Sequence, residues 1–190
     1  MDFWLKLARG IDRINEGVGR LSGWLMLAMV LIGAYNAIVR YASRWLGLNL
    51  SSNVYIELQW YLFSMVFLLG VGYALKHRSH VRVDVFYARL STKARAWVDL
   101  LGTLLFLFPV CAVMLWVTWP WVLNSWSVLE GSPDPDGLPR YPLKTVLLLS
   151  FALLLLQGIA GLIRSVATLR GRPVETVTPA APQQDTWEGV

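Results

Sequence analysis

The chain has 190 residues, of which 56% are hydrophobic and 15% are charged. A soluble globular domain is usually about 45–50% apolar and about 25% charged, so this composition argues against one. Lys and Arg (17) outnumber Asp and Glu (12), but the basic residues stand beside apolar blocks, where such residues orient membrane helices. The composition therefore predicts an integral membrane protein of one domain and disfavours nucleic acid as a partner.

The N-terminal segment, 1–20, has the pattern of an amphipathic helix. Apolar residues recur at steps of three and four, and basic residues occupy the other faces. Such a helix is predicted to lie along the inner membrane surface or against a partner, the alternative being a solvated helical extension. The apolar positions are Trp4, Leu7, Ile11, Ile14, Val18 and Leu21.

Four long apolar blocks follow, at 21–39, 58–75, 100–123 and 146–163. A helix needs about 20 mostly apolar residues to cross a bilayer core of about 30 Å. None of the blocks contains Asp, Glu, Lys, Arg or His. Because backbone in lipid must satisfy its own hydrogen bonds, and the apolar runs do not alternate as barrel strands do, helix is the expected state. The fold class is predicted to be all-α, with four transmembrane helices in a membrane domain at 21–170.

The first block is predicted to be a retained anchor rather than a cleaved signal peptide. Its 19 residues exceed the usual apolar run of about 7–15, and no small-x-small cleavage site follows it.

The basic residues predict how the helices are oriented. Thirteen Lys and Arg residues lie in the N-terminal segment, the connection between the second and third blocks, and the C-terminal segment. Only four lie in the other two connections. This asymmetry predicts that both termini are cytoplasmic. The tail at 171–190 is rich in Pro, Thr, Ala and Gln and is predicted to be a disordered cytoplasmic segment.

Small residues and prolines suggest how the spans pack. Pro109 and Pro120 lie in the third block, where either is expected to bend the helix. Small residues allow close approach of neighbouring helices, and they occur in the second block at Gly70 and Gly72 and in the fourth at Gly158, Ala160 and Gly161.

Polar side chains near the bilayer are the default functional candidates, and here they are few. Asn36 and Arg40 share a helix face at the outer end of the first block, and Glu57 and Gln59 stand at the start of the second. A short connection joins these ends, so Arg40 and Glu57 are expected to form a pair. A structural role for this ion pair is favoured over a functional role as a charged group at a transport gate.

The sequence shows no catalytic, cofactor or metal site. His77 and His80 lie in the connection after the second block, whereas a haem anchor needs histidines inside its helices. The single cysteine, Cys111, lies in an apolar block and is expected to act as a small hydrophobe. The chain is therefore predicted not to be an enzyme and to hold no cofactor. It is expected to be a structural partner of another protein that carries out the chemistry.

Several local patterns resemble the small permease subunit of tripartite ATP-independent periplasmic (TRAP) transporters. The first is Arg40-Tyr41, followed by Glu57 and the Gly-x-Gly-Tyr-Ala-Leu-Lys run at 70–76. The most specific is His80-Val-Arg82-Val-Asp84, followed by the run at 90–99. The outer connection at 126–144 and Gln157-Gly158 are also similar. The resemblance covers about 21–164.

The resemblance implies a function in the bacterial inner membrane. The small subunit of this DctQ-like family is expected to scaffold a large permease subunit, which holds the substrate and ion sites. Uptake of an organic acid is driven by an ion gradient, and a periplasmic binding protein delivers the substrate.

Site residues follow from this expectation. Glu130 and Arg140 of the outer connection are predicted to meet the binding protein, and the basic connection around Arg82 to grip the inner leaflet. His80 and Asp84 are expected to fix a turn rather than to form an ion-linked element.

Two other readings remain at this point. A membrane anchor of a respiratory-type enzyme complex is the main alternative, although it calls for in-span histidines. A small stand-alone exporter is the other, although it calls for an acidic residue in mid-membrane.

Overall fold

The computed structural model of the chain describes residues 2–47, 52–77, 90–135 and 137–171. All the regular structure in these ranges is helical. The elements are α1 (Asp2–Leu46), α2 (Asn53–Lys76), α4 (Thr92–Gly102), the π-helical segment η1 (Thr103–Leu107), α5 (Phe108–Ser127) and α6 (Tyr141–Leu169).

Four of the described helices are long and apolar enough to cross a membrane. They are Asp2–Trp45, Asn53–Lys76, Thr92–Ser127 and Tyr141–Leu169, and each contains one of the four predicted blocks. The all-helical prediction is confirmed. Each helix is longer than its block because polar residues at both ends continue the same helix.

The helix ends follow from local chemistry. The Ser52 and Ser91 hydroxyls accept hydrogen bonds from the backbone N–H groups of Val54 and Ala94, which caps α2 and α4. Gly47 and Gly171 follow the ends of α1 and α6 with φ of 65° and 73°, a conformation that only glycine adopts at little cost.

The third long helix changes its winding just before Pro109. Pro109 has no N–H, and its ring crowds the carbonyl four residues earlier. In the turn before it, the Phe108 N–H bonds to the carbonyl of Thr103, five residues back, which is the π-helical pattern. The expected irregularity at Pro109 is therefore a widened turn, and α4, η1 and α5 form one continuous helix.

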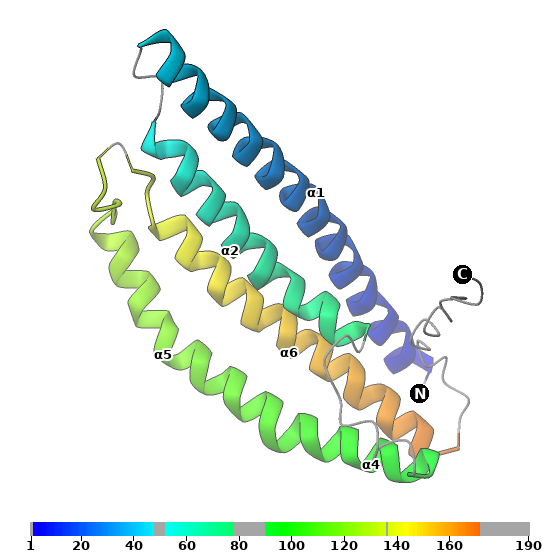
Figure 1. The fold of residues 1–190 in the computed structure, drawn as a ribbon. Coiled ribbons are helices and arrows are strands. Elements are labelled where there is room, and N and C mark those ends of the chain that lie inside the picture. The colour runs from blue at the N-terminus through cyan, green and yellow to red at the C-terminus, as the bar shows by residue number, and fades with distance from the viewer. Residues whose placement is uncertain (1, 48–51, 78–89, 136, 172–190) are drawn as a thin grey trace, which may run out of the picture.

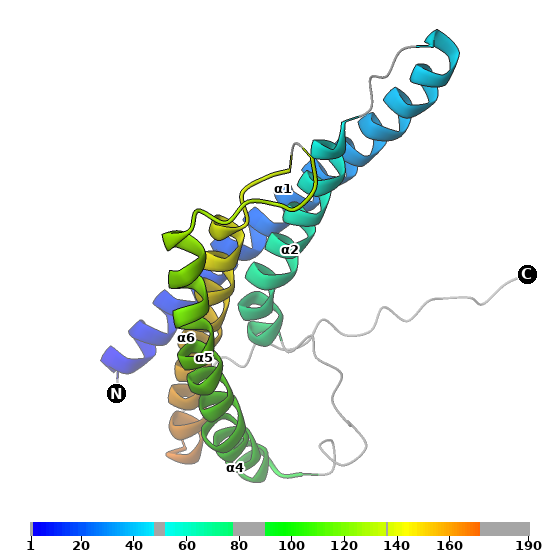
Figure 2. The ribbon, with the colours of Figure 1, turned by 90° about the vertical axis from the view of Figure 1, so that its left-hand side faces the viewer.

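The helices form an open layer in the order α1, α2, α6 and α5 (Figure 1). α6 contacts α1, α2, α4 and α5, whereas within the described ranges α5 packs substantially on α6 alone among the other long helices. α1 begins, α2 ends, α4 begins and α6 ends at one end of the molecule, which we call the basal end. The opposite end, where α1 ends and α6 begins, we call the loop end. Figure 2 shows the end of α1 reaching beyond the other helices at the loop end.

α1 continues without a break from the N-terminal segment into the first block. Its 45 residues correspond to about 68 Å, more than twice the thickness of the bilayer core. Near the basal end, α1 packs on α6 through Ala8 and Ile11, which contact Ala160 and Ile163. Trp4 and Ile14, two members of the predicted apolar stripe, are about half exposed.

Candidate functional site

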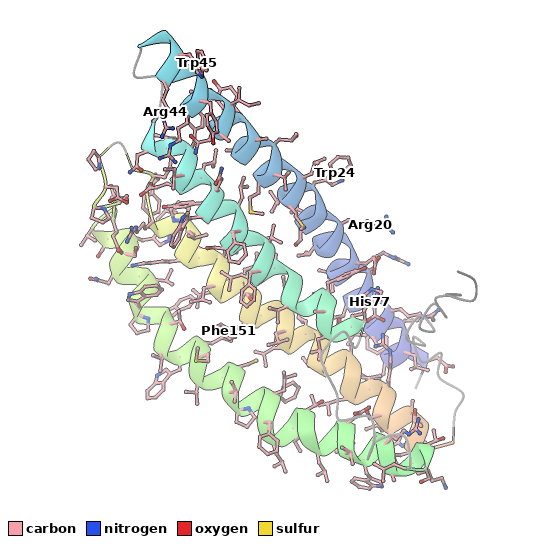
Figure 3. All side chains as sticks on the ribbon, viewed as in Figure 1. Arg20, Trp24, Arg44, Trp45, His77 and Phe151 are labelled. Carbon is pink, nitrogen blue, oxygen red and sulfur yellow. The ribbon has the colours of Figure 1, made fainter. Side chains whose placement is uncertain are left out.

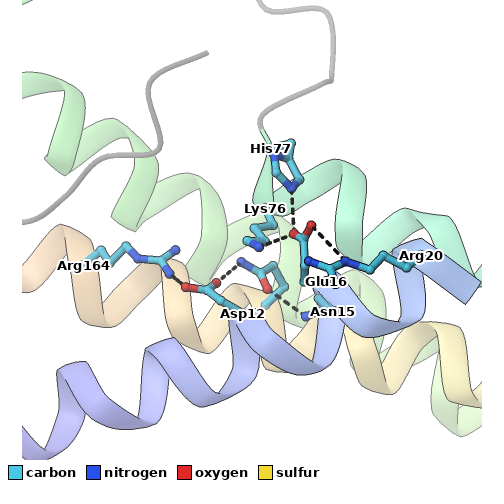
Figure 4. Close-up of polar contacts among 8 residues, drawn as sticks. Asp12, Asn15, Glu16, Arg20, Lys76, His77 and Arg164 are labelled. Carbon is cyan, nitrogen blue, oxygen red and sulfur yellow. Dashed lines mark hydrogen bonds and ion pairs between the residues drawn. The ribbon is translucent and has the colours of Figure 1, made fainter. Parts of the chain in front are cut away.

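A buried polar network joins α1, α2 and α6 at the basal end (Figure 4). Asn15 is fully buried, and its Nδ2 donates to Oε1 of Gln157 across 2.7 Å. Gln157 in turn donates through Nε2 to Oδ1 of Asp12, at 3.1 Å. The second carboxylate oxygen of Asp12 accepts from the Arg164 guanidinium. The four side chains therefore form one continuous chain of hydrogen bonds between α1 and α6.

A second branch of this basal network joins α1 to the end of α2. Nζ of Lys76 lies 2.5 Å and Nε2 of His77 3.1 Å from Oε2 of Glu16, while Nε of Arg20 lies 4.0 Å from the other oxygen. The His77 ring also contacts that of Tyr73, with 4.2 Å between centroids. The basal ends of α1, α2 and α6 are therefore linked by polar groups as well as by apolar packing.

Glycines allow the close approach that this network requires. A β-carbon added at Gly72 would lie 2.3 Å from Oδ1 of Asn15, and one at Gly19 would lie 2.2 Å from the Tyr73 ring. Real side chains do not approach this closely. Gly72 is thus confirmed as a close-packing residue, whereas among the described residues nothing lies within 4 Å of a β-carbon added at Gly70 or Gly161.

A second polar network holds the connection between α5 and α6 at the loop end. Glu57 accepts from the Ser132 hydroxyl and from the backbone N–H of Leu138, the latter at 2.5 Å. The Tyr61 hydroxyl donates to the carbonyls of Leu138 and Pro139, at 3.1 and 2.5 Å. The start of α2 therefore anchors a connection that lies about 80 residues later in the chain.

Glu130 holds the same connection from the other side. Its carboxylate accepts from Ser125 Oγ at 2.6 Å and from the Lys144 ammonium. The Lys144 hydrogen bond, and secondarily that of Ser125, lower the pKa of Glu130 below its ordinary value. Nζ of Lys144 also lies 3.9 Å from the centre of the Trp121 ring, a cation–π contact.

A cavity of about 720 Å³ opens beside this loop-end network, between α2, α5 and α6. Among the described residues, its charged lining consists of three carboxylates, Glu57, Glu130 and Asp134, and two cations, Arg140 and Lys144. The carboxylates therefore outnumber the cations, and these five side chains together carry one net negative charge. Such a site disfavours an organic anion as its ligand.

The structure places the predicted candidates in different surroundings. Glu57, Glu130 and Arg140 line the loop-end cavity together. The expected Arg40–Glu57 pair is wrong: Glu57 bonds to the α5–α6 connection, and the Arg40 side chain is exposed. Gln59 lies against Gly33 of α1. His80, Arg82 and Asp84 lie outside the described residues, as does the tail from residue 172.

Asn36 is a separate case. It is buried in α1, and its Oδ1 has no partner in the part of the chain that the structure describes. That part also contains no group of three His, Cys, Asp or Glu side chains that could hold a metal ion.

Asp12 and Asn15 are functional candidates that the sequence reasoning missed. Their signal was a stripe of small and polar residues at helical spacing, which is Ala8, Asp12, Asn15, Gly19 and Ser22. The more conspicuous aromatic and aliphatic stripe on the neighbouring faces concealed it.

Comparison with known proteins identifies the family. Residues 29–168 match the family model described as "Tripartite ATP-independent periplasmic transporters, DctQ component". The chain is also 29% identical over 143 residues to "Isethionate TRAP transporter permease protein DctMQ" of Oleidesulfovibrio alaskensis. That match covers 73% of this chain and 22% of the relative, so the chain corresponds to about a fifth of the relative's length. No solved structure matches the chain. Because the family match covers well over half of its residues, the chain belongs to the DctQ component family of TRAP transporters and is a multi-pass membrane protein of transport rather than an enzyme.

Proposed function

We propose that this chain is a static scaffold for the large permease subunit of a TRAP transporter that takes up an organic acid. The observation that carries the proposal is the absence of Asp, Glu, Lys, Arg and His from all four apolar blocks. Among the described residues, the charged side chains that bond between elements form two networks near the helix ends. A protein that carried its own ion or anion path would need such groups in mid-membrane.

The relative supports a large partner. Its printed name is that of a DctMQ permease protein, and the matched region is a minor part of that longer chain. We infer that this chain works with an equivalent large subunit, which holds the substrate and ion sites. The family favours this assignment over a membrane anchor of an enzyme complex.

The orientation belongs to the same proposal. The basal end, which carries most of the Lys and Arg residues, faces the cytoplasm, and the loop end faces the periplasm. The first turns of α1 lie at the inner membrane surface, where the exposed Phe3, Trp4 and Leu7 enter the headgroup region. The α5–α6 connection, held firmly by Glu57 and Glu130, faces the periplasmic binding protein.

Co-purification and transport test this function. A tag on the C-terminal tail should recover a much larger multispan protein in fixed ratio from native membranes. Reconstituted vesicles containing both chains and the binding protein should then take up substrate under an ion gradient. Vesicles lacking this chain should show little uptake. Recovery of the chain alone, or with a haem- or flavin-bearing partner, would refute the proposal.

A further inference from the structure

Two cavities lie one after the other along one face of α6, between α2 and the α4–α5 helix, and we call them together the groove. The loop-end cavity occupies one half, and Leu143 and Leu147 of α6 line it. A second cavity, of about 610 Å³, occupies the basal half, where α6 contributes Phe151 and Leu154. These four residues follow one another at steps of three and four, so they lie on one face of α6. Phe151 projects into the space between the helices (Figure 3).

The groove has a defined floor and walls. Ser150 Oγ donates to the Leu68 carbonyl across 2.6 Å, which ties α6 to α2 along one wall. On the other wall, Gly158 lets Leu107 and Phe108 approach α6 closely. The two walls are held to the floor but, within the described ranges, not substantially to each other.

An occupant of the groove must fit both its apolar length and its polar end. The basal half is almost wholly apolar, with Asp99 at its rim, whereas the loop-end half carries the ionisable lining described above. Three carboxylates face two cations there, so an occupant with a positive charge at its loop end is electrostatically favoured. Long apolar cavities are poorly tolerated in packed proteins because the lining loses dispersion contacts.

Other faces of the molecule are convex and suit lipid. Trp24 points from α1 away from the remaining helices (Figure 3), and Trp116 of α5 is 79% exposed. Large side chains on a ridge pack well against flexible lipid tails. A concave face instead favours a rigid partner, because helix association in a bilayer depends on close packing.

We propose that this groove, floored by Leu143, Leu147, Phe151 and Leu154, receives a transmembrane helix of the large permease subunit that carries Lys or Arg at its periplasmic end. The inference rests on the proposed function and deepens it by naming the contact surface. The fused relative fits it, because a single DctMQ chain keeps the rest of the permease beside its DctQ-like part. The helix would fill both cavities and contact α2, α5 and α6 together.

Photo-crosslinking tests the proposal in membranes that contain the whole transporter. A photoreactive phenylalanine replaces Leu147 or Leu154 in the groove. The matched controls are Leu149 and Leu156, two residues further along α6 in each case and therefore on its opposite, exposed face. We expect adducts to a transmembrane peptide of the large subunit from the groove positions, in clear excess over the control positions. Adducts to lipid alone, to a second copy of this chain, or equally from both faces would overturn the inference.

A bulky substitution gives an independent readout. Leu147→Trp places the larger ring in an open cavity, so the isolated chain should keep its melting temperature, whereas Leu149→Trp serves as the control. Recovery of the large subunit should fall about tenfold for Leu147→Trp and stay unchanged for Leu149→Trp. Equal recovery with both variants would overturn the inference while leaving the proposed function intact. Failure of the unsubstituted chain to recover any large subunit would overturn both.

Discussion

At the scale of single residues, buried amides and carboxylates hold the helices together. Asn15 and Gln157 are 0% and 3% exposed. Nδ2 of Asn15 donates to Gln157, and Gln157 donates to Asp12, while Oδ1 of Asn15 has no partner among the described residues. A buried polar group is tolerated when it is bonded and becomes costly when its partner is removed. The basal network therefore specifies which faces of α1 and α6 meet, beyond what apolar contact alone would specify.

Replacing Gln157 tests this coupling. Gln157→Leu leaves Nδ2 of Asn15 without its acceptor and should lower the free energy of unfolding by about 1–2 kcal/mol. Asn15→Ala should also destabilise, but the double variant should lose less than the sum of the two single losses. Denaturation of the detergent-purified chain measures all four proteins. Strictly additive losses would contradict a direct interaction.

Gly72 is the most sterically restricted small residue of α2. Gly72→Ala places a β-carbon against Oδ1 of Asn15, and because Asn15 is fully buried it has no free space to move into. We expect a loss of about 1–3 kcal/mol, seen as a lower melting temperature. Gly70→Ala, two residues away with open space around it, is the matched control and should not destabilise. Equal melting of the two variants would contradict the close approach of α1 and α2.

The contribution of Glu130 to the stability of the loop end depends on pH. Its folded-state pKa lies below the ordinary value of 4.5 because Lys144 and Ser125 bond to the charged form. The resulting stabilisation is complete above about pH 4.5 and is lost as the pH falls from there through the lowered pKa. The melting-temperature difference between the natural chain and Glu130→Gln should be constant from pH 7 to about 5 and shrink towards pH 3. An unchanged melting-temperature difference at pH 3 would be evidence against stabilisation by the ionised Glu130.

At the scale of elements, α5 depends on a single neighbour. Its main tertiary contact within the described part of the chain is α6, and one close approach is at Gly158, beside the widened turn of η1. The π-helical turn before Pro109 and the small residue opposite it therefore form one packing feature. This feature holds the basal part of α5, while contacts of Trp121 and Trp126 with Lys144 and Thr145 hold its loop end to α6.

Enlarging Gly158 should loosen this contact. A Val side chain there meets Leu107 and Phe108 at less than 3.0 Å and should push α5 away from α6. We expect faster proteolysis of the α5–α6 connection in Gly158→Val. Gly161→Val, one turn further along α6 with open surroundings, should keep the original rate. Identical proteolysis of both variants would show that the contact does not hold α5.

The elements that could be predicted from the sequence were those marked by a continuous run of apolar residues. Each apolar block lies inside a helix because a continuous apolar run has no other stable state in lipid. The partner of Glu57 was missed because the α5–α6 connection meets it about 80 residues later in the chain. Asn15 was missed because a polar residue in an amphipathic segment looks solvated until α6 covers it.

At the scale of the whole molecule, the even number of long helices brings the start of α1 and the end of α6 to the same end (Figure 1). Together with the charge bias, this predicts that both termini face the cytoplasm. A fluorescent reporter that is active only in the cytoplasm should work when fused to either terminus. An export-dependent phosphatase should work when it is inserted after Gly131 but not when it is fused to either terminus. Phosphatase activity at a terminus would contradict the orientation.

The central position of α6 also has a consequence for synthesis. α6 leaves the ribosome after α1, α2 and α5, yet it is the neighbour on which all three pack. The α1–α2 hairpin can pair as soon as both helices are inserted, but α4–α5 waits in the bilayer without its main neighbour until Tyr141–Leu169 follows. A chain that stops before residue 141 therefore leaves an unassembled helix exposed to membrane proteases, and completion of α6 becomes the checkpoint for these four helices.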